Sequence, residues 1–262
     1  GYSEPGAGSD VFNAQCKATP DGNGWRIDGT KMFTSGANIS DYVLMLTRTN
    51  SEVAKHKGLT MFIVPLKAEG VTVQPVFTFQ DERTNITFYD GVKIPDTYRL
   101  GQVDGGVRTM SASLELEHGG GFAKVQRAML DDAVALCGEI KVAGGKSLLA
   151  TENAQRRLAR TMANVMVSEL IQFRANWVQV EGKENLAYGP MAKMYSSEKF
   201  QSDSRDLLDL TAPHSLSKRK GAPGHLNLAY RHAHGTTIYG GTSEVHRSMV
   251  AERGLGLPRS RN

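Results

Sequence analysis

The chain has 262 residues, of which 40% are hydrophobic and 22% charged, and its formal net charge is +4. This composition is ordinary for a folded globular protein, and the length suffices for one large domain or two modest ones. The chain has no Lys/Arg run interleaved with aromatic residues and no apolar run of ~18 residues, so we expect neither nucleic-acid binding nor a membrane span.

Short apolar runs bounded by turn residues predict β structure over the first hundred residues or so. Residues 25–29 alternate between apolar and polar and end in an Asp-Gly pair, which predicts a hairpin turn. Further strands are predicted at 42–48, 59–65, 71–76, 85–90 and 92–95. Strands this regular, with short turns between them, indicate a barrel or a sandwich.

Helical spacing replaces the strand pattern near residues 101–106. We predict helices from about Val107 to Leu136, over 151–180, and from Gly189 onward. The helix at 151–180 carries an apolar stripe, which is more often core than a cofactor site: Leu158, Met162, Val165, Met166, Leu170 and Phe173. The expected fold is α+β, with a barrel-like or sandwich-like β domain at 1–103 and an all-α bundle at 104–262.

A glycine turn near the C-terminus opens the last predicted helix. Residues 238–247 read Ile-Tyr-Gly-Gly-Thr-Ser-Glu-Val-His-Arg. Adjacent glycines allow a sharp turn and close approach of a ligand, and Thr242 or Ser243 offers a hydroxyl to cap the helix. A helix N-terminus favours anionic or hydrogen-bond-accepting ligands. Taken alone, however, such a segment is more often only a turn.

Two further segments complete a recognisable set. Residues 1–10 read Gly-Tyr-Ser-Glu-Pro-Gly-Ala-Gly-Ser-Asp, and residues 28–37 read Asp-Gly-Thr-Lys-Met-Phe-Thr-Ser-Gly-Ala. With the glycine turn, and in the same order, they resemble segments of the acyl-CoA dehydrogenase family: T-E-P-x-A-G-S-D, G-x-K-x-[WF]-I-[TS]-[NS]-G and Y-[EG]-G-T-x-[EQ]-[IV]. The resemblance spans nearly the whole chain and is weakest between Gly138 and His234. It implies that an N-terminal helical domain of roughly a hundred residues is absent from this chain.

The resemblance implies an FAD cofactor and assigns six residues to it: Ser3, Ser9, Phe33, Ser35, Thr242 and Glu244. The first two would lie toward the flavin pyrimidine ring and nearby phosphate or substrate. The next two would line the isoalloxazine ring, and the last two would reach the ribityl and adenosine side. Without the resemblance, each hydroxyl would more often be a turn former.

Acyl-CoA dehydrogenation needs a carboxylate base to remove the proton α to the thioester. In many family members this base is a Glu directly after the motif Tyr, but here the position is Gly240, which cannot accept a proton. Residues 111–120 resemble an alternative family arrangement in which an earlier helix supplies the base. Glu117 matches that base, with His118 where Arg is usual, whereas Glu115 lies about 200° round the helix and is expected to be solvated. The expected substrate contacts are Ser9, Glu117, His118, Tyr239 and Gly240.

The expected function is FAD-dependent dehydrogenation of an acyl-CoA thioester to the 2-enoyl-CoA, as in fatty acid β-oxidation. Electrons would pass to an electron-transferring flavoprotein. The alternative is a non-catalytic or assembly subunit of a heteromeric acyl-CoA dehydrogenase, which Gly240 favours and Glu117 disfavours. A related oxidase acting on a substrate without CoA is a third possibility. The family's Arg-x-x-Phe-Gly-like segment is missing from residues 142–149, which weakens the case for flavin held across a dimer interface.

The remaining expectations concern partners, metals and compartment. The apolar stripe at 151–180 needs a partner surface, so we expect a homo-oligomer, a dimer or a tetramer. Cys16 and Cys137 lack metal-ligand spacing, and His232 and His234 are too few for a site, so no metal is expected. The same cysteine usage makes a reduced, cytoplasmic setting the expected one.

Overall fold

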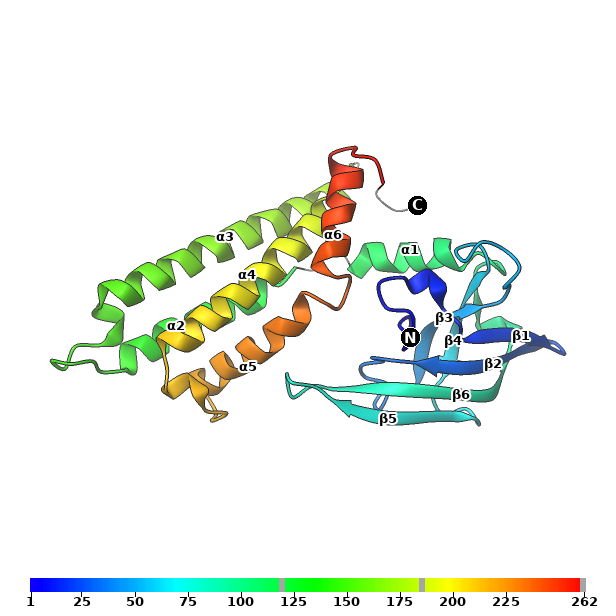
Figure 1. Cartoon of the computed structure of the whole chain (residues 1–262), viewed down its shortest axis with the longest axis horizontal. Helices are drawn as coiled ribbons and strands as arrows, with labels where there is room; N and C mark the ends of the chain where they lie inside the picture. Colours follow the sequence, from blue (N-terminus) through cyan, green and yellow to red (C-terminus); the bar gives the residue numbers. More distant parts are fainter. Residues whose placement is uncertain (118–120, 184–186, 260–262) are drawn as a thin grey trace. The chain divides into compact units, whose positions relative to one another are not determined.

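The computed structural model describes residues 1–117, 121–183 and 187–259, except for the side chains of 113–117. The chain divides into two compact units, Gly1–Leu116 and Glu117–Asn262. A seven-stranded sheet forms most of the first unit and helices form the second (Figure 1), which confirms the predicted α+β class. Helix α1 (Gly106–Glu117) belongs almost entirely to the first unit, while the domain boundary at 103/104 stays a prediction.

The sheet of the first unit has the strand order β5-β6-β2-β1-β3-β4-β7. Its strands are β1 (Lys17–Asp21), β2 (Gly24–Lys31), β3 (Tyr42–Arg48), β4 (Leu59–Pro65), β5 (Val71–Phe77), β6 (Arg83–Pro95) and β7 (Arg99–Leu100). Neighbouring strands are antiparallel except β1 and β3, which meet in parallel where Lys17 lies opposite Arg48. Every segment predicted from the apolar runs to be a strand lies within a strand.

The predicted turn at Asp28-Gly29 is wrong, because β2 continues through it to Lys31. The register of β2 against β6 shifts between Ile27 and Gly29, where one residue of β2 lies opposite two residues of β6, so the extra residue of this bulge belongs to β6. A Cβ atom at Gly29 would lie 2.8 Å from the Cα of Cys16. Close approach of two backbones therefore explains this glycine. The strands predicted at 85–90 and 92–95 are likewise one strand, β6.

Two apolar clusters hold the first unit together. Trp25 of β2 and Phe62 of β4 belong to one cluster, with ring centroids 5.2 Å apart. The other joins Leu46, Leu59 and Met110, so α1 is fixed to the sheet by a buried methionine. Among the described residues, no helix combines the length and apolarity that a membrane crossing requires.

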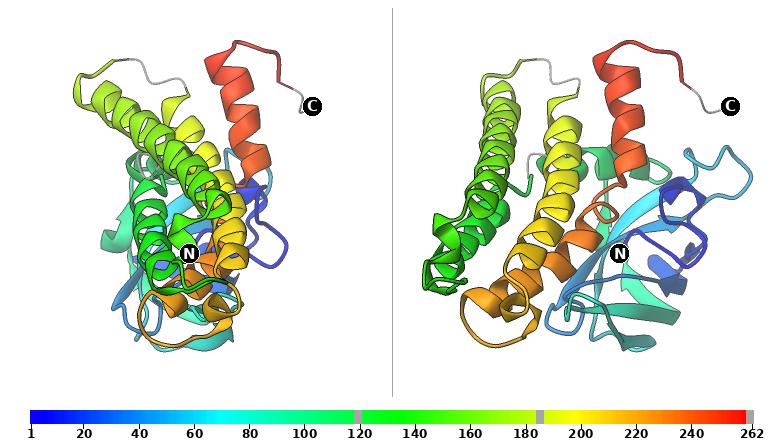
Figure 2. Two further views of the ribbon diagram at one scale, coloured as in Figure 1. Left: turned by 90° about the vertical axis from the view of Figure 1, so that its left-hand side faces the viewer. Right: turned by 60° about the vertical axis from the view of Figure 1, so that its left-hand side comes forward.

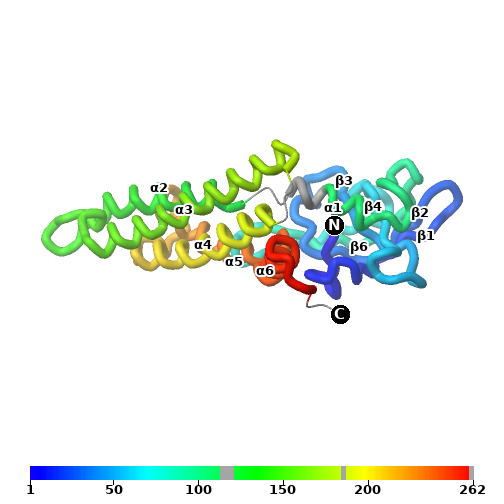
Figure 3. The backbone as a smooth tube through the Cα atoms, turned by 90° about the horizontal axis from the view of Figure 1, so that it is seen from above, coloured from blue at the N-terminus to red at the C-terminus, as the bar shows by residue number. Residues whose placement is uncertain are grey.

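The second unit is a bundle of α-helices. They are α2 (Ala123–Glu139), α3 (Glu152–Val180), α4 (Tyr188–Leu210), α5 (Ala222–Thr236) and α6 (Ser243–Met249). Helices α2, α3 and α4 run alongside one another (Figure 2). Helix α6 packs against the N-terminal half of α4, where Arg247 pairs with Glu198 (Figure 3). The threonines preceding α3 and α6 cap them: Thr151 Oγ1 accepts from Ala154 N at 3.3 Å and Thr242 Oγ1 from Val245 N at 3.2 Å.

The apolar stripe predicted on α3 is only partly buried. Leu158 and Val165 lie in the core. The other four residues lie outside the core, with exposed fractions of 38–68%: Met162, Met166, Leu170 and Phe173. The stripe is therefore divided between the core and an apolar face of α3 that no other helix of the unit covers among the described residues, and the partner surface expected for it stays a prediction.

The helical core also holds a carboxylate, Asp203 of α4, whose exposed fraction is 3%. Asn164 Nδ2 donates to both of its oxygens at 3.0 Å. Burial raises the pKa of Asp203 to about 6, and the Asn164 hydrogen bond only partly opposes this. The folded chain therefore holds the proton of Asp203 at pH values where an unfolded chain has lost it.

This raised pKa has a consequence for stability. As pH rises from about 4 to about 6, the unfolded chain loses the proton first, so folding becomes less favourable by up to about 3 kcal/mol. We expect Asp203→Asn to remove this loss, so that its stability relative to wild type is higher at pH 7 than at pH 4. Urea unfolding of both proteins at the two pH values measures this, and a difference that does not vary with pH would contradict it.

Candidate functional site

The two N-terminal segments of the first unit are joined through Ser3 and Met32. Met32 N donates to the Ser3 carbonyl at 2.9 Å. Phe33 follows with φ of 58° and an exposed fraction of 60%. A bulky residue in the left-handed region is uncommon, and such backbone strain is concentrated at ligand sites. An exposed aromatic ring on a strained backbone provides an apolar surface on which a flat ring could pack.

The other two predicted residues of this unit are also accessible. Ser35 is exposed, and its hydroxyl lies 3.0 Å from Thr84 Oγ1. Ser9 is exposed as well. The structure thus brings Ser3 next to the segment that carries Phe33 and Ser35.

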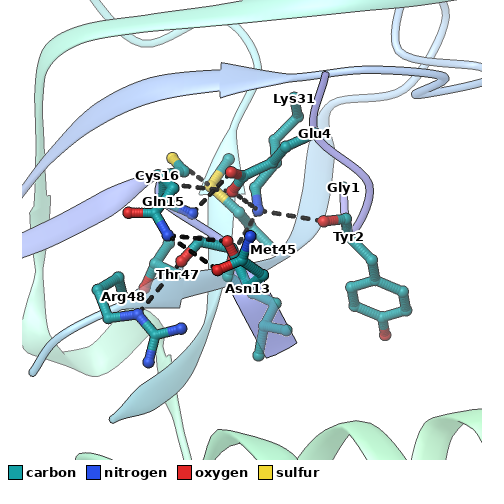
Figure 4. Close-up of polar contacts among 12 residues, drawn as sticks. Gly1, Tyr2, Glu4, Asn13, Gln15, Cys16, Lys31, Met45, Thr47 and Arg48 are labelled. Carbon is teal, nitrogen blue, oxygen red and sulfur yellow. Dashed lines mark hydrogen bonds and ion pairs between the residues drawn. The ribbon is translucent and has the colours of Figure 1, made fainter. Parts of the chain in front are cut away.

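A buried ion pair that the sequence analysis missed lies beneath these segments (Figure 4). Lys31 Nζ lies 2.7 Å from Glu4 Oε1, and the side chains are 0% and 6% exposed. The ammonium also donates to the carbonyls of Leu46 at 2.6 Å and Tyr2 at 3.3 Å. Close by, burial raises the pKa of the Cys16 thiol to about 11, which makes that cysteine a poor nucleophile.

In the glycine turn of the second unit, the carbonyl groups of Gly240 and Gly241 both have side-chain partners. Gly240 and Gly241 have φ of 65° and 90°. His246 Nε2 lies 3.0 Å from the Gly240 carbonyl, and Lys193 Nζ donates to the Gly241 carbonyl. Burial lowers the pKa of Lys193 to about 8. A Cβ atom at Gly241 would lie 2.8 Å from His246 Nε2, so only glycine fits there.

Gly240, in contrast, has room around it in the part of the chain that the structure describes. There, the nearest atom to a Cβ built at Gly240 is Lys193 Cε, at 4.0 Å. Next to it, the Tyr239 hydroxyl lies 3.2 Å from His232 Nε2, and the Tyr239 ring meets Phe122 edge to face with centroids 6.0 Å apart. The contacts with His232 and Phe122 therefore fix the orientation of the Tyr239 side chain, next to the space beside Gly240.

A shallow pocket of about 430 Å³ lies beside this turn. Its lining is rich in polar groups: Glu198, Gln201, Thr237, Ile238, Thr242, Ser243, Glu244 and Arg247. Ser243 Oγ is buried and has no hydrogen-bond partner within the described part of the chain. The pKa of Glu244 is lowered by hydrogen bonds from its own amide and from Thr242.

These residues fit the cofactor that the resemblance implies. FAD carries ribityl and ribose hydroxyls and phosphates, which need donors, acceptors and a cation. The pocket offers hydroxyls, the Glu244 carboxylate of lowered pKa and the Arg247 guanidinium, which is paired with Glu198 at 2.6 Å, and Ser243 Oγ has no hydrogen-bond partner among the described residues. The first unit, taken by itself, has the exposed Phe33 ring, which suits a flat ring.

The expected base cannot be located as a side chain. Glu117 is the last residue of α1, but its side chain and that of Glu115 lie outside the described residues, as does all of His118. Among the side chains that the structure describes, no group of three or more His, Cys, Asp and Glu residues could hold a metal ion.

Comparison with known families and proteins gives a consistent result. Residues 1–87 match the model described as "Acyl-CoA dehydrogenase, middle domain", and residues 105–255 match "Acyl-CoA dehydrogenase, C-terminal domain". The chain is 33% identical to acyl-CoA dehydrogenase FadE26 of Mycobacterium tuberculosis, over 99% of this chain and 68% of that protein.

The chain is also similar to solved structures of other proteins. The chain matches the ChsE4-ChsE5 complex from Mycobacterium tuberculosis with a TM-score of 0.90 and 31% identity. It matches the structure described as "Tcur3481-Tcur3483 steroid ACAD" with a TM-score of 0.91 and 31% identity. Each match covers 99% of this chain and 68% of the other, so the chain spans about two thirds of the length of these relatives.

Proposed function

Because the chain belongs to the acyl-CoA dehydrogenase family of FAD-dependent oxidoreductases, we propose that it dehydrogenates an acyl-CoA thioester to the 2-enoyl-CoA. The observation that carries this proposal is the pocket beside the glycine turn, where Thr242 and Glu244 flank the buried, unpartnered hydroxyl of Ser243 in the described part of the chain. Such a lining suits the sugar and phosphate groups of FAD. We propose Ser3, Ser9, Phe33 and Ser35 as further FAD contacts.

The reaction removes a proton from the α carbon and a hydride from the β carbon of the acyl group. FAD, when bound, accepts the hydride. We propose Glu117 as the base that takes the proton, because Gly240 has no side chain to do so. Ser9, His118, Tyr239 and Gly240 are proposed substrate contacts, and the His232 hydrogen bond would hold Tyr239 in one orientation.

The acyl group is proposed to be bulky and ring-containing. Where many family members carry a Glu, this chain has Gly240, with the nearest atom to a hypothetical Cβ 4.0 Å away. A similar solved structure is described as a steroid ACAD. Removing a side chain next to a reacting group creates room for a wider substrate, and the neighbouring ring of Tyr239 supplies an apolar surface for it.

Gly240→Ala tests this substrate class. A methyl group at this position reduces the open space, so kcat/KM for a polycyclic acyl-CoA should fall ~10-fold or more relative to kcat/KM for a short straight-chain acyl-CoA. The positive φ adds strain that affects both substrates alike.

Gly256→Ala is the matched control, because Gly256 has φ of 66° and no atom within 4 Å of a built Cβ. It carries the same backbone strain but should leave the ratio of the two kcat/KM values unchanged. An equal fall for both substrates in Gly240→Ala would contradict the proposal.

Membership of the acyl-CoA dehydrogenase family also supports proposals for the oligomeric state and the electron acceptor. The exposed face of α3, defined by Met162, Met166, Leu170 and Phe173, supports a homo-oligomer, a dimer or a tetramer. We propose an electron-transferring flavoprotein as electron acceptor, and β-oxidation as the metabolic setting.

Cys16 and Cys137 are both buried free thiols, which supports a reducing, cytoplasmic compartment. We retain 1–103 and 104–262 as the proposed domains.

The second candidate function is that of a subunit in a heteromeric dehydrogenase. One similar solved structure is of a complex of two proteins, ChsE4 and ChsE5, and Gly240 lacks the usual base. If this chain is the non-catalytic subunit, acyl-CoA should bleach the flavin only when a second, catalytic subunit is present. Bleaching in the protein without such a subunit would favour the catalytic function.

A further inference from the structure

We propose that Glu4 and Lys31 are a positioning pair for the flavin, which fixes the two N-terminal segments of the first unit relative to each other. The inference rests on the proposed FAD contacts of Ser3 and Phe33. It assigns a role to two residues that touch neither FAD nor substrate in that proposal.

The contacts of Lys31 centre on Ser3. Its ammonium lies 2.7 Å from Glu4 Oε1 and 3.3 Å from the Tyr2 carbonyl, so it binds both chain neighbours of Ser3. Met32 N then binds the Ser3 carbonyl itself at 2.9 Å. Because Lys31 ends β2 and Phe33 follows two residues later, one side chain links Ser3 to the start of the Phe33 segment.

The contacts of Glu4 extend this link into the sheet. Its Oε2 accepts from Gln15 N at 2.7 Å and its Oε1 from Cys16 N at 3.0 Å, just before β1 begins. Lys31 also donates to the Leu46 carbonyl of β3 at 2.6 Å. The pair therefore attaches the N-terminal segment to β2, to β3 and to the residues that lead into β1. Figure 4 shows Glu4 and Lys31 beside Gln15 and Cys16.

Burial makes this attachment rigid. The Lys31 side chain is 0% exposed and that of Glu4 is 6% exposed, so neither charge can exchange its partner for water. An ion pair this deep is a weak device for stability alone, since apolar side chains of similar volume often do as well. Its fixed hydrogen-bond geometry is better suited to setting the position of a segment.

The backbone next to Lys31 shows what the pair holds. Phe33 keeps φ of 58°, and such conformations persist only where the surroundings impose them. On its far side, Thr34 N donates to the Asn85 carbonyl at 2.9 Å. Lys31 and Thr34 are thus the two fixed points between which the exposed ring of Phe33 is presented.

The test is the FAD affinity of folded protein. We expect Lys31→Met to raise the dissociation constant of FAD at least ten-fold in the deflavinated protein, at a temperature where circular dichroism shows native structure. Bound flavin should also recover fluorescence, because its ring is less well packed. Lys93→Met is the matched control, since it removes an exposed ion pair to Asp21 of the same unit, and FAD affinity should stay within two-fold of wild type.

A folded Lys31→Met protein that binds FAD within two-fold of wild type would overturn the proposal and leave the pair a purely structural role. If the single variant does not fold, Glu4→Gln/Lys31→Met carries the same test, because it leaves no buried charge unpaired. Weak FAD binding by the folded double variant supports the proposal and normal binding overturns it. Failure of the proposed function is distinguishable, since it appears as wild-type protein that binds FAD normally but is not reduced by acyl-CoA.

Discussion

Glu117→Gln is expected to slow flavin reduction by an acyl-CoA about 10³-fold while leaving the binding of FAD and acyl-CoA nearly intact. Glutamine keeps the size and hydrogen bonding of the side chain but cannot accept the α proton. The large effect follows from Gly240, because the position that supplies the base in many relatives has no side chain here to replace it.

Anaerobic single-turnover mixing measures this rate directly, because it separates the chemical step from product release. Glu115→Gln is the matched control: it is the same substitution two residues away on α1, about 200° round the helix, and should change the rate little. If Glu117→Gln reduces flavin at the wild-type rate, another residue is the base and the assignment to Glu117 is wrong.

Lys31→Met is expected to lower the free energy of unfolding of the first unit by about 3–5 kcal/mol. The substitution leaves the Glu4 carboxylate buried without its cation, and it leaves the Leu46 carbonyl without the ammonium that lies 2.6 Å away. Of the contacts described above, Glu4 would keep those from Gln15 N and Cys16 N.

Tryptophan fluorescence can isolate this effect, because the chain has two tryptophans and Trp25 lies in the core of the first unit. In a Trp177→Phe background, urea unfolding monitored by fluorescence reports the first unit alone. Lys93→Met, which removes the exposed pair with Asp21, should cost only about 0–1 kcal/mol. If the two substitutions lower the free energy of unfolding of the first unit equally, the buried Glu4–Lys31 pair stabilises it no more than an exposed ion pair does.

The class of fold and the elements could be predicted from periodicity, but local signals failed where contacts between distant residues decide the structure. Asp28-Gly29 has the composition of a hairpin turn, yet Gly29 is needed because the Cys16 backbone lies against it. On α3, helical spacing identified an apolar stripe but could not show how much of it the bundle covers, so the exposure of Met166 and Phe173 could not be predicted.

In the candidate site, too, local features could be predicted from the sequence, whereas contacts between distant residues could not. The glycine turn and its threonine cap followed from the sequence, and the structure selects Thr242 over Ser243 as the cap. The Glu4–Lys31 pair was missed although a signal existed, since strand alternation places Lys31 on the same face as Trp25 and Ile27. A lysine on a buried face implies a buried partner, but only the folded topology brings Glu4 to it across 27 residues.

The measurement that tests the central claim most directly is anaerobic addition of acyl-CoA thioesters to the wild-type flavoprotein. Loss of the visible absorption of oxidised flavin within a single turnover, faster with a polycyclic acyl-CoA than with a short straight-chain one, is the predicted result. A flavin spectrum that stays oxidised with every acyl-CoA, in protein shown to bind both FAD and thioester, would contradict the account.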